Sequence, residues 1–189
     1  MIGVTLAVMR QVSIALTSLA VALLLALPAV AQERSLPQLL AELADPEARD
    51  AQGLQNEIRR RWSRSGSSAV DFLLLRGDQA IERGNLMGAV DHFSAAIDHA
   101  PDFAEGWNRR ATAYFLQGEY GLSIADIRVT LGLNPQHYGA LTGLGMILEE
   151  TGEIEAALAA LRMSNAINPH QQGVQEAIAR LERMLGSDA

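Results

Sequence analysis

The second half of the chain repeats itself every 34 residues, and this period limits the fold more than any other feature of the sequence. Pro101, Pro135 and Pro169 are spaced by that interval, and glycines keep the same spacing at positions 84, 118 and 152. Further positions recur in step and are either small (Ala89, Ser123, Ala157; Ala96, Thr130, Ser164) or large and apolar (Phe93, Ile127, Leu161). A chain with such a period folds as a supersecondary unit that stacks on copies of itself.

Each unit is predicted to be a helical hairpin. The second unit carries one apolar set at Trp107, Ala111 and Tyr114, and another at Ile124, Ile127 and Leu131. Spacing of three and four residues is that of a helix that buries one face. A glycine suits the left-handed backbone that ends the first helix, and a proline stands where the second helix must stop.

These residues resemble the tetratricopeptide-repeat family, whose motif has aromatic, Leu-Gly, Ala and Pro positions at fixed offsets. The match runs from Val70 to about Pro169 and is best in "AEGWNRRATAYFLQGEYGLSIADIRVTLGLNP". The resemblance implies an all-α fold, a short right-handed α-solenoid of stacked helix-turn-helix hairpins with three repeats. The chain departs from the family at Arg76 and Arg110, where Leu is common, and at Thr130 and Ser164, where Ala is usual. An arginine stem can cover apolar surface while its head reaches solvent.

We expect six segments along the chain. They are a signal peptide (1–31), an N-terminal helical segment (32–69), three repeats (70–103, 104–137 and 138–171) and a C-terminal capping helix with its tail (172–189). The capping helix offers Val174, Ile178, Leu181 and Leu185 to cover the apolar end of the third repeat.

The segment 32–69 is predicted to hold two helices that form a degenerate fourth hairpin packed on the first repeat. Ala51, Leu54, Ile58 and Trp62 make an apolar stripe along the second of these helices. Asp45 and Pro46 look like an N-cap and a first helical residue, and Ser68 with Asp71 fits a capping box that starts the first repeat.

The N-terminus has the pattern of a secretory signal peptide. Arg10 precedes an apolar run from about Val12 to Leu27, which Pro28 and the small-residue sequence "AVA" follow, so cleavage is expected after Ala31. The pattern is already complete from Met9, which we interpret as the true start. The alternative is an uncleaved anchor, because the run approaches the roughly 20 apolar residues that span a bilayer.

Composition and residue spacing argue against enzyme activity and against binding to nucleic acid. The net charge is −7, and cysteine is absent. The sequence has no nucleophile elbow and no phosphate-binding glycine loop. His92, His99, His137 and His170 lack metal-ligand spacing and are interpreted as surface or turn residues. The basic run Arg59–Arg64 is interpreted as a solvated helix end. We therefore expect no enzyme activity, cofactor, metal or nucleic-acid partner.

Binding is the function that remains. Stacked hairpins generate a concave surface, which in the resembling family is lined by the first helix of each repeat and often holds a peptide or a partner helix. Carried over by register, the groove comprises Leu74, Asp78, Ile81, Asn108, Arg109, Thr112, Phe115, Thr142, Met146 and Glu149. Asn108 and Arg109 are the strongest candidates, because an amide and a guanidinium form directional hydrogen bonds with a peptide. The carboxylate clamp of some family members is not expected, since only Arg109 keeps its place.

The sequence therefore predicts a non-catalytic adaptor or scaffold of the cell envelope, periplasmic or secreted, that binds a protein or peptide in its concave groove. Two alternatives stay open. The chain could be a self-associating structural module that forms a homo-oligomer, or an accessory factor tethered to the membrane by its uncleaved N-terminal segment. The partner and the biological process are not specified by the sequence, because a fold does not fix a function.

Overall fold

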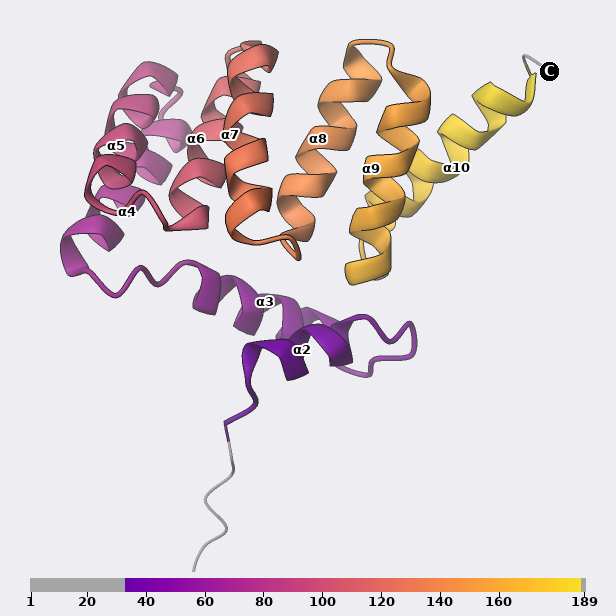
Figure 1. Cartoon of the computed structure of the whole chain (residues 1–189), viewed down its shortest axis with the longest axis horizontal. Coiled ribbons are helices and arrows are strands. Elements are labelled where there is room, and N and C mark those ends of the chain that lie inside the picture. The colour runs from indigo at the N-terminus through magenta and orange to yellow at the C-terminus, as the bar shows by residue number, and fades with distance from the viewer. Residues whose placement is uncertain (1–32, 188–189) are drawn as a thin grey trace, which may run out of the picture. The chain divides into compact units, whose positions relative to one another are not determined.

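The computed structural model describes residues 33–187, and these residues form α-helices joined by turns and short loops (Figure 1). The expected signal peptide, with Met9 and the cleavage site after Ala31, lies outside the described residues. The helices are α2 (Leu36–Leu43), α3 (Ala51–Trp62), α4 (Ser68–Glu82), α5 (Leu86–His99), α6 (Ala104–Leu116), α7 (Tyr120–Leu133), α8 (Tyr138–Glu150), α9 (Ile154–Ile167) and α10 (Gln172–Ser187). Within residues 33–187, no helix combines the length and the apolar content that crossing a membrane requires.

Helices α4 to α9 form three successive hairpins, α4–α5, α6–α7 and α8–α9, and each hairpin packs against the next. The turn inside each hairpin contains a glycine with positive φ: 71° at Gly84, 77° at Gly118 and 83° at Gly152. A side chain is strained in that conformation, so the glycine period of the sequence marks these turns. The predicted all-α solenoid is confirmed.

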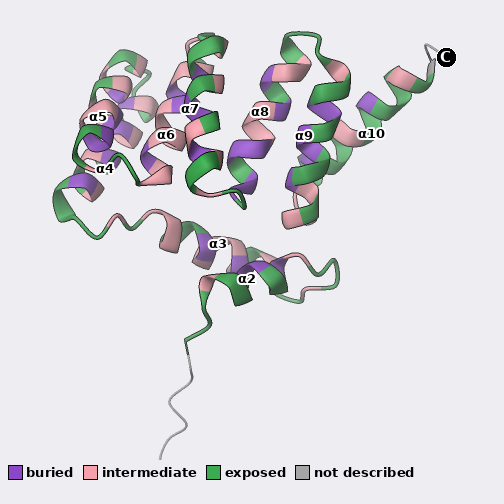
Figure 2. Cartoon of the chain, in the orientation of Figure 1, coloured by how far each residue is buried: buried purple, intermediate pink, exposed green. Residues whose placement is uncertain are grey.

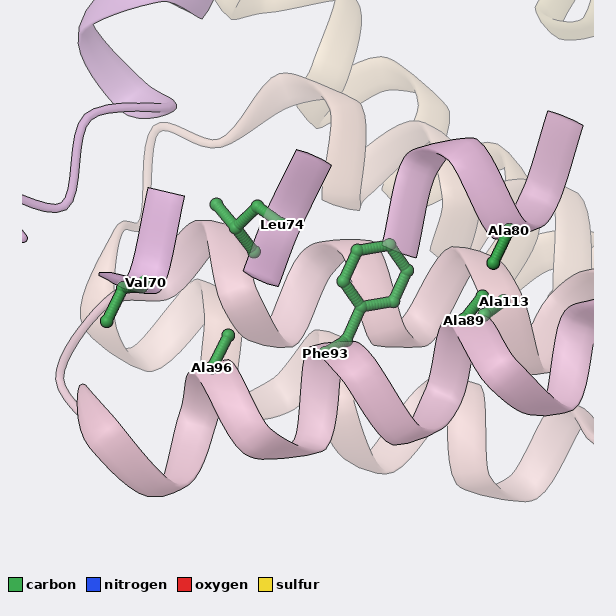
Figure 3. Packing of buried hydrophobic residues seen from close by; sticks show 7 residues of the cluster. All are labelled: Val70, Leu74, Ala80, Ala89, Phe93, Ala96 and Ala113. Atoms are coloured by element: carbon green, nitrogen blue, oxygen red, sulfur yellow. The ribbon is translucent and has the colours of Figure 1, made fainter. Parts of the chain in front are cut away.

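The first hairpin shows how the small recurring residues allow close packing. Phe93 of α5 is fully buried, and its ring lies against the backbone of Gly77 on α4. Figure 3 shows Phe93 among the small side chains of Ala80, Ala89 and Ala113, the last of which comes from α6 of the next hairpin. One cluster therefore serves both the hairpin and its contact with the following one.

Helix α10 covers the end of the third hairpin, as predicted. Val174 and Leu181 are buried against Leu158 and Leu161 of α9, and Ile178 and Leu185 pack at the edge of the same cluster. The apolar face left by the last hairpin is thereby removed from water.

Helices α2 and α3 pack elsewhere than expected. Their apolar residues (Leu39, Leu40, Leu43, Leu54, Ile58) form a cluster with Tyr138 of α8, and Ile167 of α9 packs against it. Two hydrogen bonds add to this contact: Gln55 Nε2 donates to Asn168 Oδ1 (3.4 Å), and His170 Nε2 lies 2.9 Å from the Asp45 carbonyl oxygen. The pair is therefore a strap on the third hairpin, and the prediction of a fourth hairpin packed on the first repeat is wrong.

The strap crosses the edge of the solenoid where one hairpin connects to the next. In Figure 1, α3 runs beneath the lower ends of the hairpin helices, and Figure 2 shows buried residues of α2 and α3 interleaved with exposed ones. The predicted apolar stripe of α3 is confirmed, because Leu54 and Ile58 are buried and Ala51 and Trp62 pack beside them.

Two helix starts differ from the sequence prediction. The N-cap of α3 is Asp50, whose carboxylate accepts a hydrogen bond from the Gly53 amide, while Asp45 accepts one from the Glu47 amide in the preceding turn. The N-cap of α4 is Ser67 rather than Ser68. Asp71 instead accepts hydrogen bonds from the Ser65 hydroxyl (2.6 Å) and amide (3.0 Å), which lower the pKa of its carboxyl group.

The arginine at the family's leucine position in the second hairpin is bonded within the protein, and its side chain is only 18% exposed. Arg110 forms a two-pronged ion pair with the buried Asp126 of α7, at 2.7 and 2.9 Å, and also donates to the Ser94 hydroxyl of α5 at 3.0 Å. The guanidinium lies 5.0 Å from the centre of the Trp107 ring. Arg110 therefore joins two hairpins, and the prediction that its head is solvated is wrong.

Candidate partner-binding groove

Two adjoining pockets lie on the first helices of the second and third hairpins. The larger, of about 530 Å³, has α6 and α8 on one side and α10 on the other. The smaller, of about 290 Å³, is lined by α6, α7 and α8. Phe115, Thr142 and Met146 line both pockets. We call this continuous hollow the groove.

Six of the ten predicted residues meet in the groove: Asn108, Thr112, Phe115, Thr142, Met146 and Glu149. Met146 is 47% exposed, which is high for a large apolar side chain in the middle of a helix. Phe115 and Met146 give the groove an apolar floor, whereas the Thr142 hydroxyl is already bonded to Ser164 (2.8 Å) and Gln171 (3.2 Å). The floor therefore offers apolar contact more than hydrogen bonds.

The four other predicted residues lie outside the two pockets. Leu74 is buried in the core of the first hairpin, and Ile81 packs against the same core. Leu74 therefore has almost no surface to offer a partner, which corrects its placement in the groove. The equivalent positions in the second and third hairpins, Asn108 and Thr142, are partly buried and line the groove, whereas here the side chain packs beside Val70 in the core.

Asp78 and Arg109 are bonded to each other and to further residues. Arg109 forms ion pairs with Asp78 of α4 and with Glu105 (3.0 Å), and donates to the Ser63 hydroxyl (3.0 Å) at the end of the strap. Burial would lower the pKa of Arg109, but the charges of Glu105 and Asp78 raise it above its ordinary value. Arg109 thus links α4, α6 and the end of the strap. The sequence suggested a guanidinium available to a ligand, but these partners already occupy it.

The Arg109 network extends to His137. Burial would raise the pKa of Glu105, but the hydrogen bond with His137 and the charge of Arg109 lower it. His137 Nε2 lies 3.1 Å from Glu105 Oε2, and His137 Nδ1 accepts the Ala140 amide at 3.0 Å. Nδ1 is therefore the unprotonated nitrogen, and Nε2 donates to the carboxylate. His137 stands in an inter-repeat turn, as one part of the interpretation as a surface or turn histidine expected, but its side chain is buried rather than at the surface.

The contribution of α10 to the groove was not predicted. Val174, Ala177 and Arg180 of α10 line the larger pocket, together with Gln171 just before the helix begins. Arg180 binds Glu149 of α8 through both carboxylate oxygens, at 2.7 and 2.9 Å, and so forms a charged rim beside the apolar floor. Repeat register cannot find such residues, because α10 lies beyond the last repeat. The apolar spacing predicts its buried face and leaves its exposed edge unassigned.

Comparison with known proteins identifies the family. The sequence model of the tetratricopeptide repeat matches residues 74–137. A TPR repeat-containing protein of Rhizobium etli is 36% identical over 159 residues, which make up 82% of this chain and 77% of that protein. The chain belongs to the tetratricopeptide-repeat family. Tetratricopeptide-repeat domains are protein-interaction modules.

Solved structures share the tetratricopeptide-repeat fold at low sequence identity. The first TPR of Spaghetti bound to an HSP90 peptide has a TM-score of 0.61 and 18% identity, over 64% of this chain and 95% of that one. MamA has a TM-score of 0.59 and 19% identity, over 71% of this chain and 78% of that one. The TPR2B domain of yeast Sti1, in a complex with pHsp70, has a TM-score of 0.58 and 18% identity, over 62% of this chain and 99% of that one.

Proposed function

We propose that this tetratricopeptide-repeat protein is a non-catalytic adaptor that binds a segment of another protein in the groove. The observation that carries the proposal is the half-exposed Met146 beside Phe115, where two pockets share one apolar floor. An anchor side chain of a partner that covers this floor would gain most of its binding energy there, since a few buried contacts dominate protein interfaces.

The groove also indicates the chemistry of the segment. The larger pocket has room for a large aliphatic or aromatic side chain, and its rim carries the Glu149–Arg180 ion pair. Beside it, Asn108 donates to Glu105 (3.3 Å), and its own side-chain oxygen accepts no hydrogen bond from the described residues. The expected ligand is therefore a peptide or helix with one or two large apolar anchors and a backbone or side-chain donor placed near Asn108.

The proposed location is the cell envelope, as a periplasmic or secreted protein released by cleavage after Ala31. The signal-peptide pattern of the sequence supports this location. N-terminal sequencing of the protein from its host tests it. A first residue of Gln32 supports release, whereas retention of residues 12–27 in the membrane fraction would favour the tethered alternative.

The adaptor function is tested by crosslinking and mass spectrometry in the native host, with Met146→Asp compared with wild type. A matched control is Met163→Asp, because Met163 is 59% exposed on α9 and lines neither pocket. A partner that is captured by wild type and by Met163→Asp but lost with Met146→Asp supports the groove. Equal capture by all three proteins contradicts it, and capture of the chain by itself alone favours the self-associating alternative.

A further inference from the structure

The outer face of α4 is exposed, whereas the equivalent positions on α6, 34 residues later, pack against the preceding hairpin. Phe72, Leu75, Arg76 and Gln79 form this surface, which we call the end face. Thirty-four residues later, the positions of Phe72, Arg76 and Gln79 are Gly106, Arg110 and Ala113 on α6. Comparison of the two helices therefore shows what the end face lacks.

On α6, all three positions contact α5 of the preceding hairpin. A Cβ atom added to Gly106 would lie 3.3 Å from the Ile97 side chain. Arg110 donates to the Ser94 hydroxyl at 3.0 Å. Ala113 is buried in one cluster with Ala89 and Phe93. This register is the hairpin-to-hairpin interface of the solenoid.

On α4, the same register is uncovered. Phe72 is 59% exposed and Leu75 is 51% exposed, because the strap packs on the third hairpin and leaves this end of the solenoid open. Arg76 makes no hydrogen bond or ion pair with any of the described residues. Arg110 is held by Asp126, whose counterpart in the first hairpin is His92, so Arg76 lacks the carboxylate within its own hairpin.

We propose that the end face binds an amphipathic helix of a partner protein, and that this helix carries a carboxylate opposite Arg76 and a small residue opposite Phe72. The carboxylate would complete the ion pair that Arg76 lacks. The small residue is required because Phe72 is large where the later hairpins have Gly106 and Ala140, so the approaching helix must leave room for its ring.

The charge of Arg76 favours a partner helix over two other possible occupants of the end face, which are residues 1–32 and a second copy of the chain. Residues 1–32 of the chain contain no aspartate or glutamate, so they cannot pair with Arg76. A second copy that used the same face would pair this patch with itself, as a two-fold interface does. Phe72, Leu75, Arg76 and Gln79 include no carboxylate, so the end face of a second copy cannot supply the partner that Arg76 lacks. The end face shares no residue with the groove, so it would add a second binding surface to the proposed adaptor.

The chain itself supplies the template for a probe, because α5 is the helix that covers this register on α6. The probe is a synthetic, helix-stapled peptide of residues 84–101 with Ser94→Glu, to meet Arg76, and Ile97→Ala, to make room for Phe72. The control peptide carries Ser94→Arg and Ile97→Ala. Binding of both peptides to the protein expressed from the full chain is measured by fluorescence anisotropy.

We expect the acidic peptide to bind at least tenfold more tightly than the basic one, and Arg76→Glu to reverse that order. Phe72→Asp should abolish binding, whereas Met87→Asp, at a site that is 78% exposed and outside the end face, should leave it unchanged. Circular dichroism verifies that each variant keeps its helix content. Equal affinities for the two peptides, no binding of either, or an unchanged affinity in Phe72→Asp would overturn the proposal. So would light scattering that shows a dimer dissociated by Phe72→Asp, because the occupant would then be a second copy.

Discussion

The Trp62 indole stacks on the His137 imidazole, with ring centroids 4.6 Å apart and planes inclined by 18°. Trp62 is the last residue of α3, and His137 caps α8, so this contact joins the strap to the third hairpin. Trp62 also packs against Tyr138, at 5.2 Å between centroids. Three aromatic rings thus hold the strap at the edge of the solenoid.

Removal of the Trp62 ring should release the strap. Because Trp62 is partly buried, Trp62→Ala should lower the free energy of unfolding by about 2–3 kcal/mol, somewhat less than a fully buried tryptophan would. Hydrogen exchange should show that α2 and α3 lose protection while α4 to α9 keep theirs. Trp62→Phe is the matched control, since it keeps a ring over His137. Unchanged protection of α3 in Trp62→Ala would show that other contacts hold the strap.

The Tyr138 hydroxyl is a second test of the same interface. It is buried and has no hydrogen-bond partner among the described residues, and burial raises the pKa of Tyr138. Such an unmade hydrogen bond costs about 1–3 kcal/mol. Tyr138→Phe should therefore be neutral or stabilise the protein by about 1 kcal/mol in chemical denaturation. A clear destabilisation would mean that the hydroxyl is bonded in solution.

Substitution by alanine should change the stability of the protein in opposite directions at Gly77 and at Gly132. A Cβ atom at Gly77 would overlap the Phe93 ring, so Gly77→Ala should destabilise the protein by roughly 1–3 kcal/mol. Gly132 lies in the last turn of α7 with open space around it, so Gly132→Ala should stabilise the protein by about 0.5 kcal/mol. Thermal unfolding of both variants measures the two effects. Equal shifts would contradict the close approach of α4 and α5.

Glu105 should make stability depend on pH in the acid range. Its pKa is lowered in the folded protein, so its contribution to stability is complete above its unfolded pKa, near 4.3, and is lost as the pH falls through the folded value. Glu105→Gln should cost about 1.5–3 kcal/mol at pH 6, which is the range for a hydrogen bond to a charged group.

The difference between wild type and Glu105→Gln should then shrink toward pH 3, as denaturation curves at several pH values would show. Glu155→Gln is the control, because Glu155 is exposed and makes no ion pair with the described residues. A pH-independent difference would exclude Glu105 as the titrating group.

The repeated part of the fold could be predicted because its packing is encoded locally. Gly84, Gly118 and Gly152 mark turns that require positive φ, and the residues between them alternate at helical spacing. The same register brought Asn108, Phe115 and Met146 to one groove. It failed at Leu74, which is buried in the first hairpin, whereas the equivalent Asn108 and Thr142 are only partly buried and line the groove.

The strap could not be predicted because its partners are far away in the sequence. The stripe of Leu54, Ile58 and Trp62 shows that α3 buries one face, but nothing local says against which surface. The signal lay in Tyr138, a large aromatic residue at the start of α8 where Ala104 stands one repeat earlier. Ion pairs such as Arg109–Asp78 could not be predicted from the sequence either, because 31 residues separate the two partners.

The central claim is that the groove is where a partner binds, and site-specific photocrosslinking in the native host tests it most directly. A photoreactive amino acid replaces Leu116, a half-exposed residue that lines the smaller pocket, or Met163 as the control on α9. The account predicts that one partner is crosslinked from position 116 and not from position 163, and that Met146→Asp removes the crosslink. Crosslinks of equal yield from both positions, or a crosslink from position 116 that survives Met146→Asp, would contradict it.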